Sequence, residues 1–398
     1  MLNIWPELPI YVMYNDTVTV VEDSTENAMA ALKLKGSISR IGLTVKSGSV
    51  WEKIAAVMQD PFPILEYLTL EWDFDMIPVI SDSFLGGSAP HLRDLSLHGI
   101  LFPALPNLLL SAANNLVDLV LGDIPHSGYI SPEAMVTYIS VLTQLESLSL
   151  GFRSPRSCPD KAGRFPPQLT RTLLPALTCL SFKGVTEYLE DFVSRIDVPL
   201  LESTHITFFN QLVFDIVHFP NLVCRTKKFT ALDQAHVFLD SSSIEIRLSL
   251  KSRTIDPIWL DLEISCEQVD WQLSALVQVC NLCLASTLPS LECLSIYGDQ
   301  SSSRHWRDDI ENTQWLELLG PFAAVKDLYL SKEVALHVAS SLKELSKERV
   351  TEVLPALQNI FIDGLEPSGL VQEVLHKFVT ARGRQVSSLP VAVHSWAR

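Results

Sequence analysis

The chain has 398 residues, of which 47% are hydrophobic and 19% charged, a composition that supplies a large buried core and excludes wholesale disorder. With 46 acidic and 30 basic side chains it carries a formal net charge of −16, which argues against nucleic acid and against an anionic membrane as partners. Seven scattered cysteines indicate reduced thiols, and neither a signal peptide nor a membrane-spanning apolar segment is present. We therefore expect an intracellular protein, cytoplasmic or nuclear.

A short leucine pattern, L-x-x-L-x-L, recurs from the first residues to the last. Neighbouring copies in the first half begin roughly 25 to 30 residues apart, which is the length of a strand, a turn, a helix and a return loop. The copies are ISRIGL at Ile38, LEYLTL at Leu65, LRDLSL at Leu92, LVDLVL at Leu116, LESLSL at Leu145, LTCLSF at Leu177, LECLSI at Leu291, VKDLYL at Val325 and LQNIFI at Leu357.

The pattern predicts an α/β leucine-rich-repeat solenoid. The last two apolar residues of a copy, such as Leu68 and Leu70, are two apart and face the same side of a strand, so stacked copies form a parallel sheet with one apolar wall. Between strands the period changes to about 3.6, as in Val334, Val338 and Leu342, which indicates amphipathic helices. We expect a curved parallel sheet on the concave face and helices on the convex face.

Along the chain the pattern varies in clarity. In residues 199–288 apolar and polar residues still alternate as in strands, but the leucine spacing is lost. This segment is interpreted as degenerate repeats, with a small separate domain as the alternative. A final helix containing Val371, Val374, Leu375 and Phe378 is expected to cap the array. The expected segments are 1–36 as an N-terminal capping segment, 37–198 as leucine-rich repeats, 199–288 as degenerate repeats, and 289–398 as C-terminal repeats with the capping helix.

Side chains that alternate with the leucines point to the opposite, concave side, and a partner protein is expected to be recognised there. The residues expected to bind it are Tyr67, Thr69, Asp94, Ser96, Asp118, Ser147, Ser149, Asp327, Tyr329 and Asn359.

Two segments between repeats are further candidates for partner contacts. Segment 151–175 is basic and rich in proline, so it could contact an acidic partner or form a solvated loop. Segment 301–315 holds two tryptophans among charges, which could anchor an interface; alternatively, Trp315 begins a helix and packs inward. The basic side chains of the first segment are Arg153, Arg156, Lys161, Arg164 and Arg171.

The sequence offers no catalytic motif, so we expect neither an enzyme nor a bound cofactor or metal. Cys280 and Cys283 form a C-x-x-C near Cys266 and Cys293, which could suggest zinc, but the apolar helical surroundings favour core cysteines. Nucleophile elbows, phosphate-binding loops and H-E-x-x-H are absent from the sequence.

Four stretches of the chain resemble a family of F-box-like proteins from mushroom-forming fungi. They are WRDDIENTQWLELLGPFAAVKDLYLSKE (306–333), RVTEVLPALQNIFIDGL (349–365), VAVHSW (391–396) and the opening WPELPI (5–10).

In that family a helical F-box docks onto the Skp-type adaptor of a cullin ubiquitin ligase, and the repeats are expected to receive a substrate. Here the sequence begins at what resembles the junction after the F-box, without the F-box itself. The resemblance implies a non-catalytic substrate-receptor region that binds a protein partner, with a Skp-type adaptor only if an F-box is supplied upstream. The alternatives are an adaptor-free structural or decoy repeat protein, and an enzyme of unrecognised type.

Overall fold

The computed structural model describes most of the chain in eleven stretches. They are residues 8–16, 22–72, 77–157, 171–211, 214–251, 259–266, 269–298, 312–345, 352–363, 369–383 and 392–396. The chain forms two compact units, Met1–Leu201 (unit 1) and Glu202–Arg398 (unit 2). The four expected segments divide the chain more finely than this, and that division stays a prediction.

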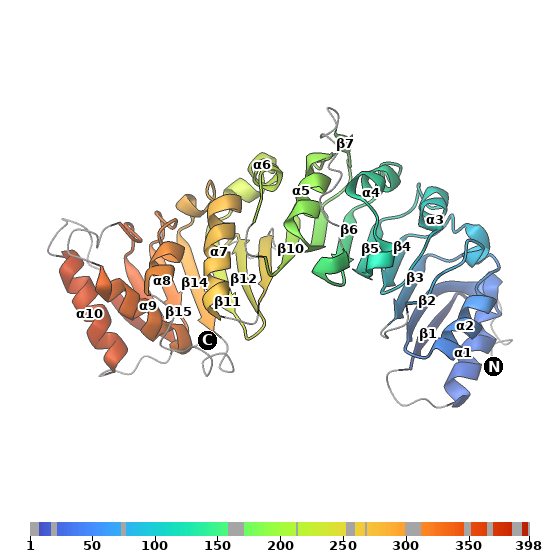
Figure 1. The fold of residues 1–398 in the computed structure, drawn as a ribbon, viewed down its shortest axis with the longest axis horizontal. Helices are drawn as coiled ribbons and strands as arrows, with labels where there is room; N and C mark the ends of the chain where they lie inside the picture. Colours follow the sequence, from blue (N-terminus) through green and yellow to red (C-terminus); the bar gives the residue numbers. More distant parts are fainter. Residues whose placement is uncertain are drawn as a thin grey trace. The chain divides into compact units, whose positions relative to one another are not determined.

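Unit 1 is a stack of strand–helix repeats. Its seven main strands follow chain order across the sheet and are all parallel: β1 (Ile10–Asn15), β2 (Ile38–Val45), β3 (Tyr67–Trp72), β4 (Asp94–His98), β5 (Asp118–Ile124), β6 (Ser147–Phe152) and β8 (Cys179–Gly184). The helices between them are α1 (Glu22–Leu32), α2 (Gly48–Val57), α3 (Leu105–Ser111), α4 (Pro132–Ile139) and α5 (Thr186–Ser194). They line one side of the strands (Figure 1), and β7 (Thr172–Leu173) pairs separately with β9 (Ile196–Asp197).

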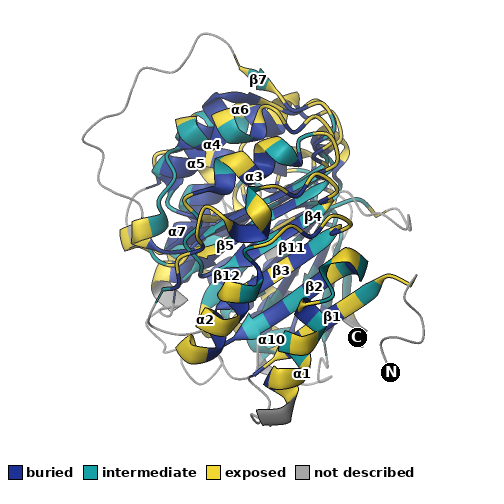
Figure 2. Ribbon diagram, turned by 90° about the vertical axis from the view of Figure 1, so that its right-hand side faces the viewer, coloured by how far each residue is buried: buried dark blue, intermediate teal, exposed yellow. Residues whose placement is uncertain are grey.

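The strands of unit 1 are aligned on their leucines, which confirms the repeat. Leu68 of β3 pairs in register with Leu95 of β4, and the series continues through Leu119, Leu148 and Leu180. All five are at most 1% exposed, so each strand adds one layer to the same core. Figure 2 shows the consequence, because buried and partly exposed residues alternate along the strands, as a two-residue period requires.

The regular layers of unit 1 are interrupted at the ends of β4 and β5. The two-residue alternation that gives Leu68, Leu70 and Trp72 in β3 gives Leu95, Leu97 and Gly99 at β4, so a large core side chain is replaced by none. Gly99 has φ of 68°, a left-handed conformation that glycine adopts without steric cost. In β5 the register shifts between Leu121 and Ile124.

Unit 2 also holds a sheet covered by helices, with the strand order β10 (Ser203–Phe209), β13 (Trp259–Ser265), β12 (Ser243–Ser249), β11 (Gln234–Leu239), β14 (Cys293–Gly298), β15 (Asp327–Leu330), β16 (Asn359–Asp363) and β17 (Ala392–Trp396). Its helices are α6 (His218–Arg225), α7 (Val269–Cys283), α8 (Asn312–Leu319), α9 (Lys332–Glu344) and α10 (Leu370–Gly383). The strands β14 to β17 are parallel and repeat the arrangement of unit 1.

The expectation of a parallel sheet throughout is wrong for β12. β12 runs antiparallel to both of its neighbours, β11 and β13. Only residues 240–242 join β11 to β12, and the Asp240 amide donates to the Ser243 carbonyl at 2.9 Å. A connection this short can form a hairpin but cannot cross over to a parallel strand.

The sequence suggested that the C-terminal helix would be the last element, and this expectation is wrong. Val374, Leu375 and Phe378 of α10 are buried as expected, but β17 follows and pairs in parallel with β16. The array in unit 2 is therefore extended by a strand after the helix.

Two other expectations about side-chain packing are confirmed within α7 and α8. Cys280 and Cys283 are each 1% exposed, and burial raises the pKa of Cys280 to about 12, so this thiol stays protonated. Trp315 is fully buried near Leu318 and Leu319 on α8, while Trp306 lies outside the described residues. Among the described helices, none combines the length and apolarity needed to cross a bilayer.

Candidate functional site

The face of each sheet opposite the helices, here called the open face, carries the side chains that alternate with the buried leucines. In unit 1, Tyr67, Asp94, Asp118 and Ser147 form one row of in-register partners. Thr69, Ser96 and Ser149 lie in a second row, where Val120 takes the place on β5. All of the expected residues in these rows except the exposed Thr69 are half-buried, because neighbouring strands flank them at about 4.8 Å. Unit 1 thus brings seven of the expected binding residues onto one surface.

The two aspartates of the first row are close enough to perturb each other. Burial, the charge of Asp118 and a hydrogen bond between the two side chains together raise the pKa of Asp94 to about 6. Nearby, the Arg40 guanidinium lies 4.0 Å above the Tyr67 ring centre. The Asp94–Asp118 pair would be relieved by a positive group, so this part of the open face favours a cationic contact.

In unit 2 the remaining expected residues lie on β15 and β16. The Asn359 amide donates to Asp327 at 2.7 Å, and the two residues are register partners. Tyr329 stacks on Phe361 with ring centres 4.4 Å apart and planes 9° apart, and Phe361 stacks in turn on His394 at 5.0 Å. Such a stack holds the rings rigidly and turns their edges toward solvent.

The sequence analysis missed a cluster of charges on the open face of β10, β12 and β13. This ion network comprises His205, Glu245, Arg247, Asp261 and Glu263. Asp261 accepts from His205 Nδ1 and from Arg247 Nη2, each at 3.0 Å, and Arg247 Nη2 also lies 2.6 Å from Glu245. Alternation within each strand could have placed each residue on the open face, but the antiparallel pairing that brings them together has no leucine signature.

Hydrogen bonding and charge lower the pKa of one carboxyl group of the ion network and raise that of another. Burial opposes ionisation of Asp261, but hydrogen bonds and charge from His205 and Arg247 outweigh it and lower its pKa. Burial and the charge of Asp261 raise the pKa of Glu245 to about 7. The hydrogen bond to Asp261 raises the pKa of His205. The network therefore joins His205, Asp261 and Arg247 beside a carboxyl group, Glu245, that titrates near neutral pH.

One part of the ion network has the composition of a hydrolytic triad. Thr207 Oγ1 lies 3.2 Å from His205 Nε2, while Nδ1 of the same ring bonds to Asp261. Thr207 is only 6% exposed and hydrogen-bonds to Glu263 at 3.0 Å, so a substrate carbonyl has no path to its oxygen. The hydrogen bond to Asp261 also raises the pKa of His205, which favours the protonated form of the ring over the form that accepts a proton. This arrangement holds the surface in place rather than activating a nucleophile.

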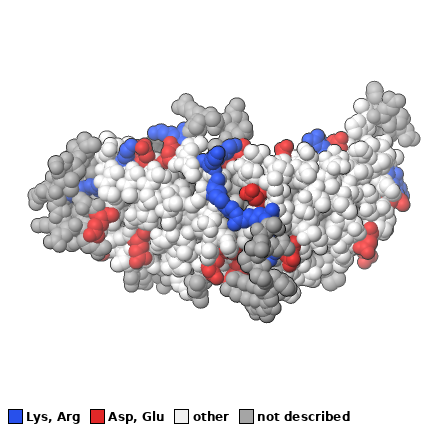
Figure 3. Space-filling model, turned by 90° about the horizontal axis from the view of Figure 1, so that it is seen from above, with Lys and Arg blue, Asp and Glu red and all other residues white. Residues whose placement is uncertain are grey.

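The five basic residues expected in segment 151–175 are not brought together among the described residues. Arg153 and Arg156 are exposed, Arg171 Nε donates to the Ser194 carbonyl at 3.2 Å, and Lys161 and Arg164 lie outside the described residues. Figure 3 shows a surface that is mostly uncharged, with a short run of adjoining Lys and Arg side chains and small groups of acidic side chains.

Comparison with known proteins adds little. The chain matches no family model and no curated protein. Among solved structures it is similar to a leucine-rich repeat-containing protein, LegL7, from Legionella pneumophila, with 11% sequence identity and a TM-score of 0.31 over 96% of this chain and 92% of that one. The strand register and the burial of this chain's own residues define its fold.

Proposed function

We propose that this chain is a protein-recognition module that binds its partner on the open face of its strands. The observation that carries the proposal is the register of unit 1, where each repeat places its leucines in the core and its polar residues in rows on the other side. A preformed row of side chains held by a parallel sheet loses little conformational freedom on binding, which favours a broad protein surface as the ligand.

The surface chemistry supports binding rather than catalysis. Stacked Tyr329 and Phe361 provide rigid aromatic area, and Tyr67 and Asn359 add polar edges, which is the mixture found where proteins contact one another. The concave curvature of the sheet and the binding roles of the ten expected residues are part of this proposal.

The finer proposal is that the partner is a substrate of a cullin ubiquitin ligase. It is supported by the resemblance of segments 306–333, 349–365 and 391–396 to F-box-like proteins of mushroom-forming fungi. In that setting an F-box would bind the Skp-type adaptor and the repeats would bind the substrate. The competing proposal, an adaptor-free repeat protein, keeps the same open-face binding without the ligase.

Affinity capture with the 398-residue chain tests the proposal. The test variant changes Asp94, Asp118 and Tyr329 to Ala on the open face. The matched control changes Glu52, Glu133 and Glu317 to Ala, three exposed helix residues. We expect a protein captured by wild type and control but lost, by tenfold or more, from the test variant. Equal capture by all three chains would contradict open-face binding, and recovery of a Skp-type adaptor and cullin would favour the ligase.

A further inference from the structure

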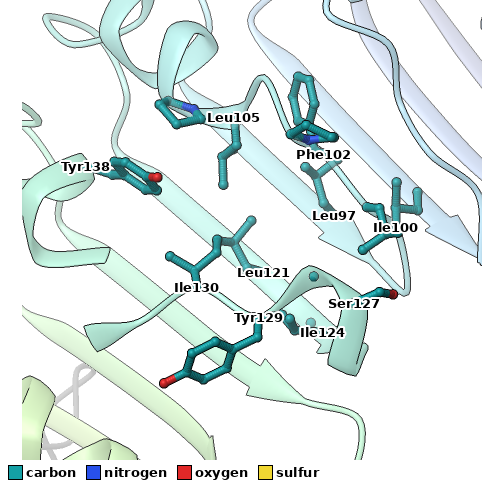
Figure 4. A pocket seen from close by; sticks show the side chains of 15 residues that line it. Leu97, Ile100, Phe102, Leu105, Leu121, Ile124, Ser127, Tyr129, Ile130 and Tyr138 are labelled. Atoms are coloured by element: carbon teal, nitrogen blue, oxygen red, sulfur yellow. The ribbon is translucent and has the colours of Figure 1, made fainter. Parts of the chain in front are cut away.

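A cavity of about 290 Å³ lies in unit 1 at the ends of β4 and β5, apart from the residues proposed to bind protein. Figure 4 shows Leu121 and Ile130 on one side of it and Leu97, Ile100 and Phe102 on the other. The walls come from β4, β5, the start of α3 and the segment leading into α4. The cavity is therefore formed by two successive repeats of a single unit and opens to solvent.

The cavity coincides with the interruption of the repeat. Gly99 occupies the position in its repeat that Trp72 occupies at β3 and Phe152 at β6. Both of those aromatic side chains are buried. At the next strand, the register shift after Leu121 and the left-handed Asp123, with φ of 49°, move the chain away from the regular ladder. Bulges and left-handed non-glycine residues cost energy and occur often beside binding sites.

Two glycines in the cavity wall cannot carry a side chain without displacing a neighbour. A Cβ on Gly122 would lie 2.1 Å from Nδ1 of His98, and a Cβ on Gly128 would lie 2.7 Å from Cδ2 of Leu101. The backbone at these two positions is thus packed closely against neighbouring side chains.

The lining side chains are mostly apolar, and their polar groups are the hydroxyls of Ser127, Tyr129 and Tyr138, so the walls fit a largely apolar ligand that carries a polar group. Ile100, Phe102 and Ile130 are half-buried, so part of their apolar surface faces the opening. The Tyr138 side chain directs its hydroxyl toward Leu105 at the edge of the cavity (Figure 4). An engineered apolar cavity of about 150 Å³ holds benzene, so a space of 290 Å³ accommodates about two fused rings.

We propose that this cavity is a binding site for a small bicyclic aromatic molecule that carries a hydroxyl or N–H group. Leu97, Leu121 and Ile130 contact the rings, and the Tyr138 hydroxyl pairs with the polar atom. The site is independent of the open face, so it stands whether or not the proposed protein recognition does.

Binding of 2-naphthol to the full chain, followed by its fluorescence and by calorimetry, tests the site. We expect saturable one-to-one binding with a dissociation constant on the order of 0.1 to 1 mM. Ser127→Trp places a ring at the mouth from an exposed lining position and is expected to weaken binding at least tenfold. His126→Trp, its exposed neighbour outside the lining, is the matched control and is expected to bind as wild type does.

A second variant tests the role assigned to the hydroxyl. Tyr138→Phe is expected to weaken 2-naphthol binding about fivefold while leaving naphthalene binding unchanged. Thermal denaturation of each variant checks that it is folded. No saturable binding by wild type, or equal binding by Ser127→Trp and wild type, overturns the proposal.

Discussion

The two units build the same kind of apolar core but arrange the opposite face differently. In unit 1 all main strands are parallel, so equivalent positions of successive repeats become neighbours and Asp94 meets Asp118. In unit 2 the antiparallel β12 pairs with β13, so Arg247 and Asp261 become register partners. His205 meets the same Asp261 across the parallel pair β10–β13, although the two residues are 56 apart in the chain. A uniform repeat places like side chains side by side, whereas the inserted β12 brings an arginine beside the aspartate of β13.

This difference affects stability as well as chemistry. The Asp94–Asp118 pair is a repulsion that remains until a proton or a cation relieves it. The ion network of unit 2 compensates its own charges, since Asp261 contacts both His205 and Arg247. The open face of unit 1 is therefore set to gain from a cationic partner, while that of unit 2 is held in place before any partner arrives.

The largest effect is expected where the two units are alike, in their leucine cores. Leu148→Ala in unit 1 and Leu294→Ala in unit 2 each remove a fully buried side chain and should cost about 3 to 4 kcal/mol of unfolding free energy. Leu110→Ala, at a position 63% exposed, is the control and should cost under about 1 kcal/mol. Urea denaturation measures all three; a small loss for either buried leucine would show that the two cores are not equivalent.

The next largest loss of stability is expected from the ion network, which lies in unit 2 alone. Asp261→Ala removes the carboxylate that His205 and Arg247 share, and we expect a loss of about 2 kcal/mol. This is less than for a fully buried pair because both partners are about two-fifths exposed. Denaturation of Asp261→Ala beside Arg247→Ala and the double variant measures the coupling between them. Additive losses in the double variant would mean that the ion network does not act as a unit.

A smaller effect is expected from pH, through Glu245 and His205 of unit 2. A carboxyl group whose folded pKa is about 7 binds its proton more tightly when folded, so stability falls as pH rises from its unfolded pKa toward and through 7. The raised pKa of His205 acts in the same direction, because its contribution is present below its unfolded pKa and is lost as pH rises through the folded value.

Thermal denaturation between pH 6 and pH 8 tests this dependence. We expect a lower melting temperature at pH 8 and a flatter profile for Glu245→Gln, which keeps a hydrogen-bond donor without titrating. A profile for Glu245→Gln as steep as that of wild type would assign the dependence to other groups.

The smallest effect has the opposite sign and lies in unit 1. Asp94→Asn removes the repulsion with Asp118 and should stabilise the protein by less than about 1 kcal/mol at pH 7, since Asp94 is only half-buried and solvent screens the repulsion. The gain should vanish below pH 4, where wild-type Asp94 is protonated as well. Destabilisation at pH 7 would instead mean that Asp94 makes a favourable contact as an anion.

The sequence by itself determined the layers of the repeats. Leucines two residues apart, such as Leu68 and Leu70, can only share one face of a strand, and the same spacing at Leu95 and Leu97 sets the register. The helix periodicity near Val334 and the inward packing of Trp315 followed from local patterns in the same way. These features were predictable because each is decided by residues that are close together in the chain.

Only the tertiary structure decided how strands pair and pack where the leucine pattern is missing. The antiparallel insertion of β12 depends on a three-residue connection, and the ion network depends on that insertion. The cavity lies beside the shifted register of β5, which is visible only when β5 is paired with β6. Long-range pairing and packing are set by free energy summed over the whole core, and no short stretch of sequence contains that sum.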